Sequence, residues 1–534
     1  MSDCGAIDHI HSEFKPGTPG TGTMKPGFPA NNSDYTMLAA VSGGCDADCP
    51  GGAKPTQFFG GISHAVVAGV LPIEMVDRSL IRVFTAAIGL GLLDDPTLSP
   101  YAHLADKDLD TPRTRQLNLE ASLQSMVLLK NEPLDGKPVL PLAKGSKIAL
   151  IGPHFNSTQD LLSDYSPGHW WAHSPLMAAQ AMAKAGEITL AGSAQGCDLE
   201  GNSTAGFAAA LALAKTAGVV PIVFVGLSPN NDPGNSGTPP VTAHNSALES
   251  EGHDRTDITL QGAQEPLIKA LYAANPATVV VLIHGGALDI TWTKNNVNAI
   301  LDAHYPGQMG GDAILHTLLN YRGAAPAGRL TTTAYQHAFT ERPMSDMSLN
   351  NITYKHYTGE VCYPFGWGLS YSQFHVQWAN SSSISQRVGT DEMLASHSEY
   401  FVARAKGDHA WTSPASYSAT IKNVGKFASD YVLLGFVSSP ARIAMDPAEP
   451  LRELFDFARV SLAPGASTTV HLSVPASVLS HVDVHGDERI MAGEYKIELG
   501  GEWLGDSTGL ESTLSVMGMT QTLFSLSEVR AKHG

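Results

Sequence analysis

Helical segments alternate with short, wholly apolar segments through the middle of the chain, and this alternation limits the fold more than any other feature. Apolar segments of this kind predict strands that are buried on both faces. Such strands, alternating with helices, predict a parallel α/β sheet covered by helices on both sides. The predicted strands are residues 148–151, 219–225, 278–283 and 299–301, and the predicted helices are residues 120–129, 205–217, 264–274 and 310–319.

The start of the chain follows a different pattern. Helices are predicted at residues 61–70 and 74–90, and the second has an apolar face that includes Leu80 and Phe84 at helical spacing. The polar segment 111–119 is predicted to connect this part to the α/β part.

After Phe374 the chain changes to short segments that alternate apolar and polar residues, separated by turn pairs such as Pro464-Gly465. A period of two predicts strands with one buried face, and strands at this spacing are typical of a β-sandwich. The clearest examples are residues 417–421, 470–474 and 495–499.

Composition excludes several classes of protein. Hydrophobic residues make up 43% of the 534 residues and charged residues 16%, which is typical of a globular chain. The net charge of −18 argues against nucleic acid or an anionic membrane as a partner. No apolar run has the length of a bilayer span, and no signal peptide pattern is visible. Cys45 and Cys49 lack a second Cys/His pair, so no metal site is predicted.

Two acidic motifs indicate possible chemistry. Asp3 lies in the segment 2–7, where the following small residues suit a strand end that carries a carboxylate into a pocket. Glu249 and Glu251 follow the long loop 227–247, which leaves the end of a predicted strand, a preferred place for binding residues. Each carboxylate alone is more often a solvated surface charge. Two carboxylates on separate segments are, however, the minimum set for cleaving a glycosidic bond.

The order of several motifs resembles glycoside hydrolase family 3, in the branch of β-xylosidases and α-L-arabinofuranosidases. The segment 363–371, Tyr-Pro-Phe-Gly-Trp-Gly-Leu-Ser-Tyr, strongly resembles a signature of this family. The other matching motifs, in chain order, are residues 2–7, 44–49, 127–131, 151–153, 248–255, 305–311 and 326–329.

The resemblance implies an α/β fold in three parts. The first, residues 1–115, would be the remnant of a (β/α)8 barrel. The second, residues 116–376, would be the family's α/β sandwich domain, and the third, residues 395–505, a fibronectin type III-like β-sandwich.

The resemblance also carries roles to single residues. It makes Asp3 the catalytic nucleophile and puts Glu249 in the place of the acid/base, with Glu251 as the competing candidate. Retaining cleavage needs two carboxyl groups about 5–5.5 Å apart and no cofactor. Cys4 and Cys49 flank motifs expected at the same barrel mouth, so they are expected to form a disulfide in a secreted enzyme.

The implied reaction is release of terminal β-xylosyl or α-arabinofuranosyl residues from xylan or arabinoxylan fragments outside the cell. Most of the family's barrel, with its sugar-binding residues, is not found before Asp3, so little or no hydrolysis is expected of this chain by itself. Two alternatives stay open: a non-catalytic carbohydrate-binding or scaffold remnant, and a β-glucosidase of the same family. The oligomeric state cannot be predicted.

Overall fold

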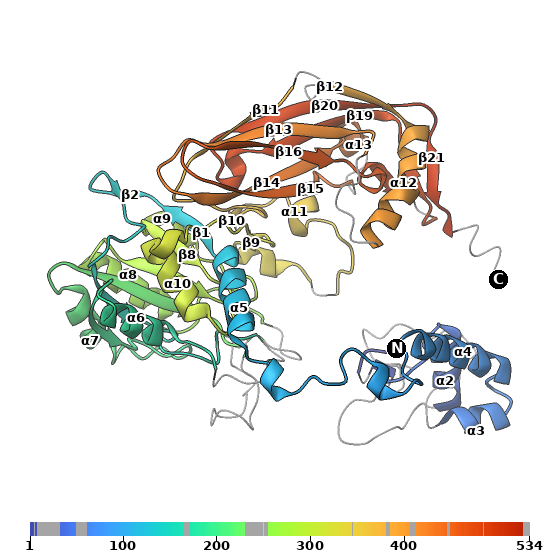
Figure 1. The fold of residues 1–534 in the computed structure, drawn as a ribbon, viewed down its shortest axis with the longest axis horizontal. Coiled ribbons are helices and arrows are strands. Elements are labelled where there is room, and N and C mark those ends of the chain that lie inside the picture. The colour runs from blue at the N-terminus through green and yellow to red at the C-terminus, as the bar shows by residue number, and fades with distance from the viewer. Residues whose placement is uncertain are drawn as a thin grey trace. The chain divides into compact units, whose positions relative to one another are not determined.

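Figure 1 shows the fold of the computed structural model, which describes residues 1–4, 6–7, 33–49, 61–163, 166, 171–229, 249, 255–343, 345–380, 385–405, 413–445, 449–483 and 485–526. The chain divides into two compact units, residues 1–111 and residues 112–534. Among the described residues, every helix is too short or too polar to cross a lipid bilayer.

The first unit is mainly helical in its described residues. A small apolar core holds the first two helices together; it includes Met37 of the first helix, Ala65 of the second, and Leu71 from the turn that follows. The predicted helices near residues 61–70 and 74–90 are both present. The bounds are α2 (Ser33–Ser42), α3 (Ile62–Val67), α4 (Ile73–Gly89), and the short turns η2 (Pro96–Leu98) and η3 (Asp106–Asp108).

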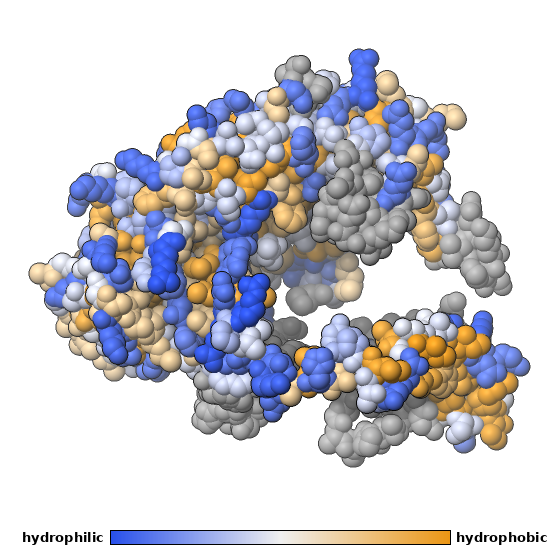
Figure 2. Space-filling model, viewed as in Figure 1, coloured by the Kyte–Doolittle hydropathy of each residue, from blue (hydrophilic) through white to orange (hydrophobic). Residues whose placement is uncertain are grey.

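The apolar face of α4 is exposed. Phe84 and Ile88 are 50% and 63% exposed, whereas the small polar Ser79 is buried. Figure 2 shows hydrophobic residues gathered over this helix. An exposed apolar patch of this kind is typical of a contact surface.

A six-stranded sheet begins the second unit. Its strands lie in the order β1-β8-β7-β6-β4-β5, with β4 to β8 parallel and β1 antiparallel to β8. Strands such as β7, with the sequence Val-Val-Val-Leu-Ile, are buried over their whole length. The bounds are β1 (Val127–Asn131), β4 (Lys147–Ile151), β5 (Thr189–Ala194), β6 (Val219–Gly226), β7 (Val279–Ile283) and β8 (Ala299–Asp302).

Helices cover both faces of this sheet, as predicted (Figure 1). On one face Ile314 of α10 shares a core with Leu150 of β4. On the other, Leu267 of α8 packs with Val223 of β6. The bounds are α5 (Pro112–Ser125), α6 (Pro175–Lys184), α7 (Phe207–Ala214), α8 (Gln264–Ala274), α9 (Thr291–Asn296) and α10 (Gly310–Leu319).

The sequence prediction was wrong around α5 and β1. Residues 127–129 do not end a helix; they form part of β1, and the helix before them begins at Pro112, in the segment predicted to be a connection. Residues 127–129 are almost completely buried, and β1 pairs with β8, so tertiary pairing outweighed the local helical pattern. This antiparallel edge also makes the sheet mixed instead of wholly parallel.

Two further sheets form the predicted β-sandwich around a core that includes Tyr417, Leu433 and Ile497. One sheet has the order β11-β13-β16 and the other β12-β20-β19-β14-β15. The bounds are β11 (Phe374–Trp378), β12 (Ser385–Gly389), α12 (Thr390–Ala405), β13 (Ser416–Asn423), β14 (Ser429–Ser438), β15 (Glu453–Leu462), β16 (Ser467–Ser473), β19 (Gly493–Gly500) and β20 (Gly509–Met517).

Short elements complete the second unit. They are β2 (Pro133–Leu134), β3 (Lys137–Pro138), η4 (Tyr321–Gly323), β9 (Ala334–Tyr335), η5 (His337–Glu341), α11 (Thr353–His356), β10 (Val361–Tyr363), α13 (Pro440–Met445), η7 (Ala476–Leu479), β17 (Ser480–Val482), β18 (Glu488–Ile490), η8 (Glu502–Leu504) and β21 (Gln521–Phe524).

Arg329 connects the α/β part to the β-sandwich. Its Nη1 donates to the carbonyl oxygens of Gly368 and Leu504 at 2.8 and 2.9 Å. Its Nη2 donates to Val432 O at 3.1 Å and to Asp506 Oδ1 at 2.5 Å. The Arg329 and Asp506 side chains are only 10% and 4% exposed, so this is a buried ion pair with four donor contacts.

Replacing Arg329 with Ala is expected to lower the free energy of unfolding by about 3–5 kcal/mol, because it leaves Asp506 buried without its partner. Arg459→Ala is the matched control, since Arg459 and Asp430 are more accessible to solvent, at 28% and 24% exposed, and we expect a loss nearer to the roughly 0–1 kcal/mol of a solvated surface pair. Urea unfolding followed by circular dichroism measures both changes. Equal losses from the two substitutions would contradict the role of Arg329.

Candidate active site

The carboxyl edge of the six-stranded sheet is the natural place for a site. From β4 the chain first adds β5 on one side and then β6 on the other, so the strand order reverses at β4 and β6. In open parallel sheets, ligands bind outside the carboxyl ends of the strands at such a point. Residues that follow β4, β6, β7 and β8 meet at this edge.

Glu249 is held firmly at this edge. Its backbone N–H donates to Ser228 O at 2.9 Å, two residues beyond β6. Its carboxylate accepts from the N–H of Gly286 at 2.6 Å, and also from the N–H of Gly285 and the hydroxyl of Tyr305. The Glu249 side chain is only 13% exposed. Both of its oxygens therefore act as acceptors.

The two glycines are needed for this close approach. A Cβ atom at Gly286 would stand 2.4 Å from Glu249 Oε2, and one at Gly285 would stand 3.2 Å from Oε1. Consecutive backbone N–H groups that point the same way form a small anion-binding concavity. The turn after β7 is such a concavity, and the carboxylate of Glu249 fills it.

Two further groups complete the surroundings of Glu249. Arg255 Nη1 lies 3.6 Å from Glu249 Oε2 and donates to Ala287 O at 2.9 Å. Burial, together with the Glu249 charge, raises the pKa of Tyr305 far above its usual range, so its hydroxyl stays protonated and donates to Glu249. Among the described residues, the carboxylate that Arg255 pairs with is therefore that of Glu249.

A buried carboxylate fixes the strand end that precedes Glu249. Asp160 accepts from Ser228 Oγ at 2.5 Å and from Ser157 Oγ at 2.7 Å, and it lies 3.2 Å from His154 Nδ1. Burial alone would raise the pKa of Asp160, but His154 and the two hydroxyls outweigh it and lower the pKa. Ser228 is thereby tied to an ionised group while its carbonyl oxygen accepts from Glu249.

Asp3 belongs to the first unit, where it is exposed and accepts from the N–H of Cys4 at 2.8 Å. Cys4 is bonded to Cys49, with Cα atoms 4.4 Å apart. Ser2 Oγ accepts from the N–H of Cys49 at 2.9 Å and donates to Asp48 at 3.1 Å. The segment that carries Asp3 is thus attached to the segment 45–49 by a covalent bond and by hydrogen bonds.

The segment 45–49 is in turn anchored to α4. Arg82 Nε donates to Asp46 Oδ2 at 2.8 Å. The hydrogen bonds from Arg82 hold the pKa of Asp46 at about 2, so the carboxylate stays charged at neutral pH.

Sequence reasoning missed the partners of Glu249. Tyr305 lies in the segment 305–311 that supports the family resemblance, but the sequence predicts no role for it. Glu251 and most of the loop 227–247 lie outside the described residues.

Comparison with known proteins agrees with the motifs. Residues 126–371 match the glycosyl hydrolase family 3 C-terminal domain, and residues 432–503 match the fibronectin type III-like domain. Proteins named probable exo-1,4-beta-xylosidase from Aspergillus terreus and Aspergillus clavatus are 31% and 32% identical to this chain. The alignments cover 93% of this chain and 58% of each relative.

Solved structures lead to the same family. A GH3 exo-beta-xylosidase in complex with a xylobiose aziridine activity-based probe superposes with a TM-score of 0.78 and 27% identity, covering 98% of this chain and 61% of that one. A beta-glucosidase from Listeria innocua, 20% identical, has the same fold with a TM-score of 0.71 over 97% of this chain and 63% of its own. The predicted resemblance to glycoside hydrolase family 3 is confirmed, because residues 126–371 match its C-terminal domain, and the chain spans a little over half the length of these relatives.

Proposed function

We propose that this chain carries the catalytic carboxylates of a retaining glycosidase that releases terminal β-xylosyl residues from xylo-oligosaccharides. The observation that carries the proposal is its alignment with proteins named exo-1,4-beta-xylosidase over 93% of its length. α-Arabinofuranosyl residues are a second substrate of the same class. The Cys4–Cys49 disulfide supports an extracellular location, because such bonds persist in oxidising compartments.

In this proposal Asp3 is the nucleophile. Its carboxylate attacks the anomeric carbon of the terminal xylose and forms a covalent glycosyl-enzyme while the leaving oxygen takes a proton from the acid. In the second step the same acid, now ionised, removes a proton from water, and water displaces Asp3. Attachment of the segment to residues 45–49 supports a defined position for Asp3.

We propose that Glu249 has a positioning role and that Glu251 is the acid/base, and the contacts of Glu249 support this choice. A general acid must present an O–H to the leaving oxygen. Both oxygens of Glu249 instead accept from Gly285, Gly286 and Tyr305. Glu249 would then anchor the segment on which Glu251 stands two residues later.

The test uses residues 1–534 joined to the part of the A. terreus relative that precedes the matched region, here called the joined protein. The joined protein is given an aryl β-xyloside, and proton NMR identifies the first sugar released, before it mutarotates. We expect this sugar to be β-xylose. α-Xylose as the first product would contradict a retaining mechanism. Faster turnover of an aryl β-glucoside would favour the β-glucosidase alternative, and no turnover of either would favour a non-catalytic protein.

A further inference from the structure

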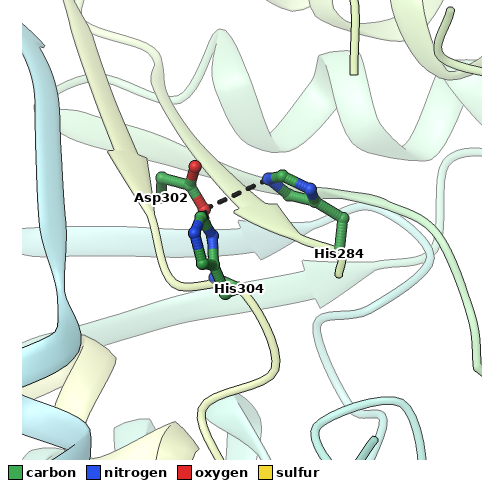
Figure 3. A group of neighbouring side chains, drawn as sticks. All are labelled: His284, Asp302 and His304. Atoms are coloured by element: carbon green, nitrogen blue, oxygen red, sulfur yellow. Dashed lines mark hydrogen bonds and ion pairs between the residues drawn. The ribbon is translucent and has the colours of Figure 1, made fainter. Parts of the chain in front are cut away.

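Three side chains that the proposed reaction does not use gather beside the Glu249 site. His284 directly follows β7, Asp302 ends β8, and His304 lies two residues further on. Their donor atoms all lie within 4.8 Å of one another. Figure 3 shows both imidazole rings turned toward the Asp302 carboxylate. Two neighbouring strands of the parallel sheet thus bring two nitrogens and one carboxylate to a single point.

The hydrogen bond of His284 to the backbone directs its other ring nitrogen into this cluster. Its Nδ1 lies 2.7 Å from Gly286 O, and because a carbonyl oxygen only accepts, Nδ1 carries the proton. Its Nε2 is buried and lies 3.2 Å from Asp302 Oδ1 as an ion-pair contact, and among the described residues it has no hydrogen bond of good geometry. Metal-binding histidines commonly use one ring nitrogen for a backbone carbonyl and the other for the ion.

Asp302 and His304 are the other two members of this cluster, which is open to solvent on one side. Asp302 is only 3% exposed, whereas the His304 side chain is 33% exposed, so solvent reaches the cluster from the His304 side. His304 Nδ1 lies 2.5 Å from Asp302 Oδ1, and the backbone N–H of His304 donates to the same oxygen at 3.0 Å. His304 adopts φ 50°, a left-handed conformation that is uncommon for non-glycine residues.

We propose that His284 Nε2, Asp302 and His304 Nδ1 form a binding site for a divalent transition-metal ion such as Zn²⁺. Zn²⁺ binds His nitrogen and Asp oxygen at about 2.0–2.2 Å, and sites with three protein ligands leave a fourth position for water. Imidazole nitrogens select such ions over Mg²⁺ and Ca²⁺. The alternative is that the histidines share a proton with Asp302 and no metal ion binds, because the same carboxylate attracts either cation.

The site would stabilise the turn that holds Glu249. His284 fixes Gly286 O, and the N–H of Gly286 donates to Glu249. A metal ion on His284 would restrict this turn from the opposite side. Zn²⁺ binding does not depend on glycosidase activity, so a failure of this proposal can be distinguished from a failure of the proposed function.

The experiment titrates the 534-residue chain, freed of metal with a chelator, with ZnCl₂ by isothermal calorimetry and follows its melting temperature. We expect one Zn²⁺ per chain, a higher melting temperature with Zn²⁺, and no response to MgCl₂. His304→Ala, at the exposed side of the site, is expected to weaken Zn²⁺ binding more than about tenfold, since loss of even an outer-shell partner costs 10- to 100-fold. Asp302→Asn is expected to do the same.

His173→Ala is the matched control, because His173 also pairs with a carboxylate, Asp312, at 2.8 Å and is 38% exposed, but among the described residues no third ligand joins this pair. It is expected to bind Zn²⁺ as the unchanged chain does. Cobalt absorption bands of nitrogen and oxygen coordination should form with the unchanged chain and be lost with His304→Ala. The absence of a Zn²⁺ response, or equal affinity in His304→Ala and His173→Ala, would overturn the proposal and favour the shared proton.

Discussion

Replacement of Asp3 with Asn is expected to abolish hydrolysis of every xyloside by the joined protein, whatever the leaving group. An amide cannot attack the anomeric carbon, so the glycosyl-enzyme does not form. Removal of the nucleophile from another hydrolase lowered kcat by about 10⁶-fold, and we expect a loss of this order here. The measurement is the initial rate on a dinitrophenyl β-xyloside and on xylobiose.

Asp48→Asn serves as the control for this substitution. Asp48 lies in the segment attached to Asp3 and accepts from Ser2 Oγ at 3.1 Å, but no chemistry is proposed for it. Its loss is expected to leave most of the turnover intact, since one hydrogen bond contributes about 0.5–1.5 kcal/mol. Similar turnover by Asp3→Asn and Asp48→Asn would exclude Asp3 as the nucleophile.

The second large effect separates Glu251 from Glu249. With Glu251→Ala, the rate on xylobiose should fall about 10²- to 10⁴-fold, the usual contribution of a general acid. The rate of glycosyl-enzyme formation from the dinitrophenyl xyloside should change little, because this leaving group needs no proton. Azide should restore turnover of the activated substrate, because it attacks the glycosyl-enzyme without a general base.

Glu249→Ala is expected to behave differently. It leaves the N–H groups of Gly285 and Gly286 without their acceptor and the Arg255 guanidinium without its carboxylate partner. The segment therefore loses its anchor. Rates on good and poor leaving groups should then fall to the same degree, and azide should restore neither. Thermal unfolding should also show a loss of about 1–3 kcal/mol or more, the penalty for unsatisfied buried donors. Azide rescue in Glu249→Ala, with none in Glu251→Ala, would return the acid/base role to Glu249.

The fold was predictable where burial follows directly from local composition. Residues 264–274 and 310–319 form α8 and α10 with the predicted bounds, because apolar residues recur at helical spacing between helix-breaking neighbours. The strand at residues 127–131 was missed because its partner strand, β8, lies far along the chain.

The surroundings of Glu249 could not be predicted for a related reason. Gly285 follows β7, Tyr305 follows β8 and Glu249 follows β6. Only the order of these strands in the sheet places the three residues side by side. His284 and Asp302 lie 3.2 Å apart although a helix separates them in the sequence. No spacing rule for paired Cys and His residues would have found such a cluster.

The most direct measurement of the central claim is covalent trapping of the nucleophile in the joined protein. A 2-deoxy-2-fluoro-β-xyloside with an activated leaving group should form a glycosyl-enzyme that hydrolyses slowly, since loss of the 2-hydroxyl contacts weakens both transition states. Peptide mass spectrometry is expected to find one fluoroxylosyl group, on Asp3, and none in Asp3→Asn. A label on another carboxylate, or rapid turnover of β-xylosides by Asp3→Asn without any label, would contradict this account.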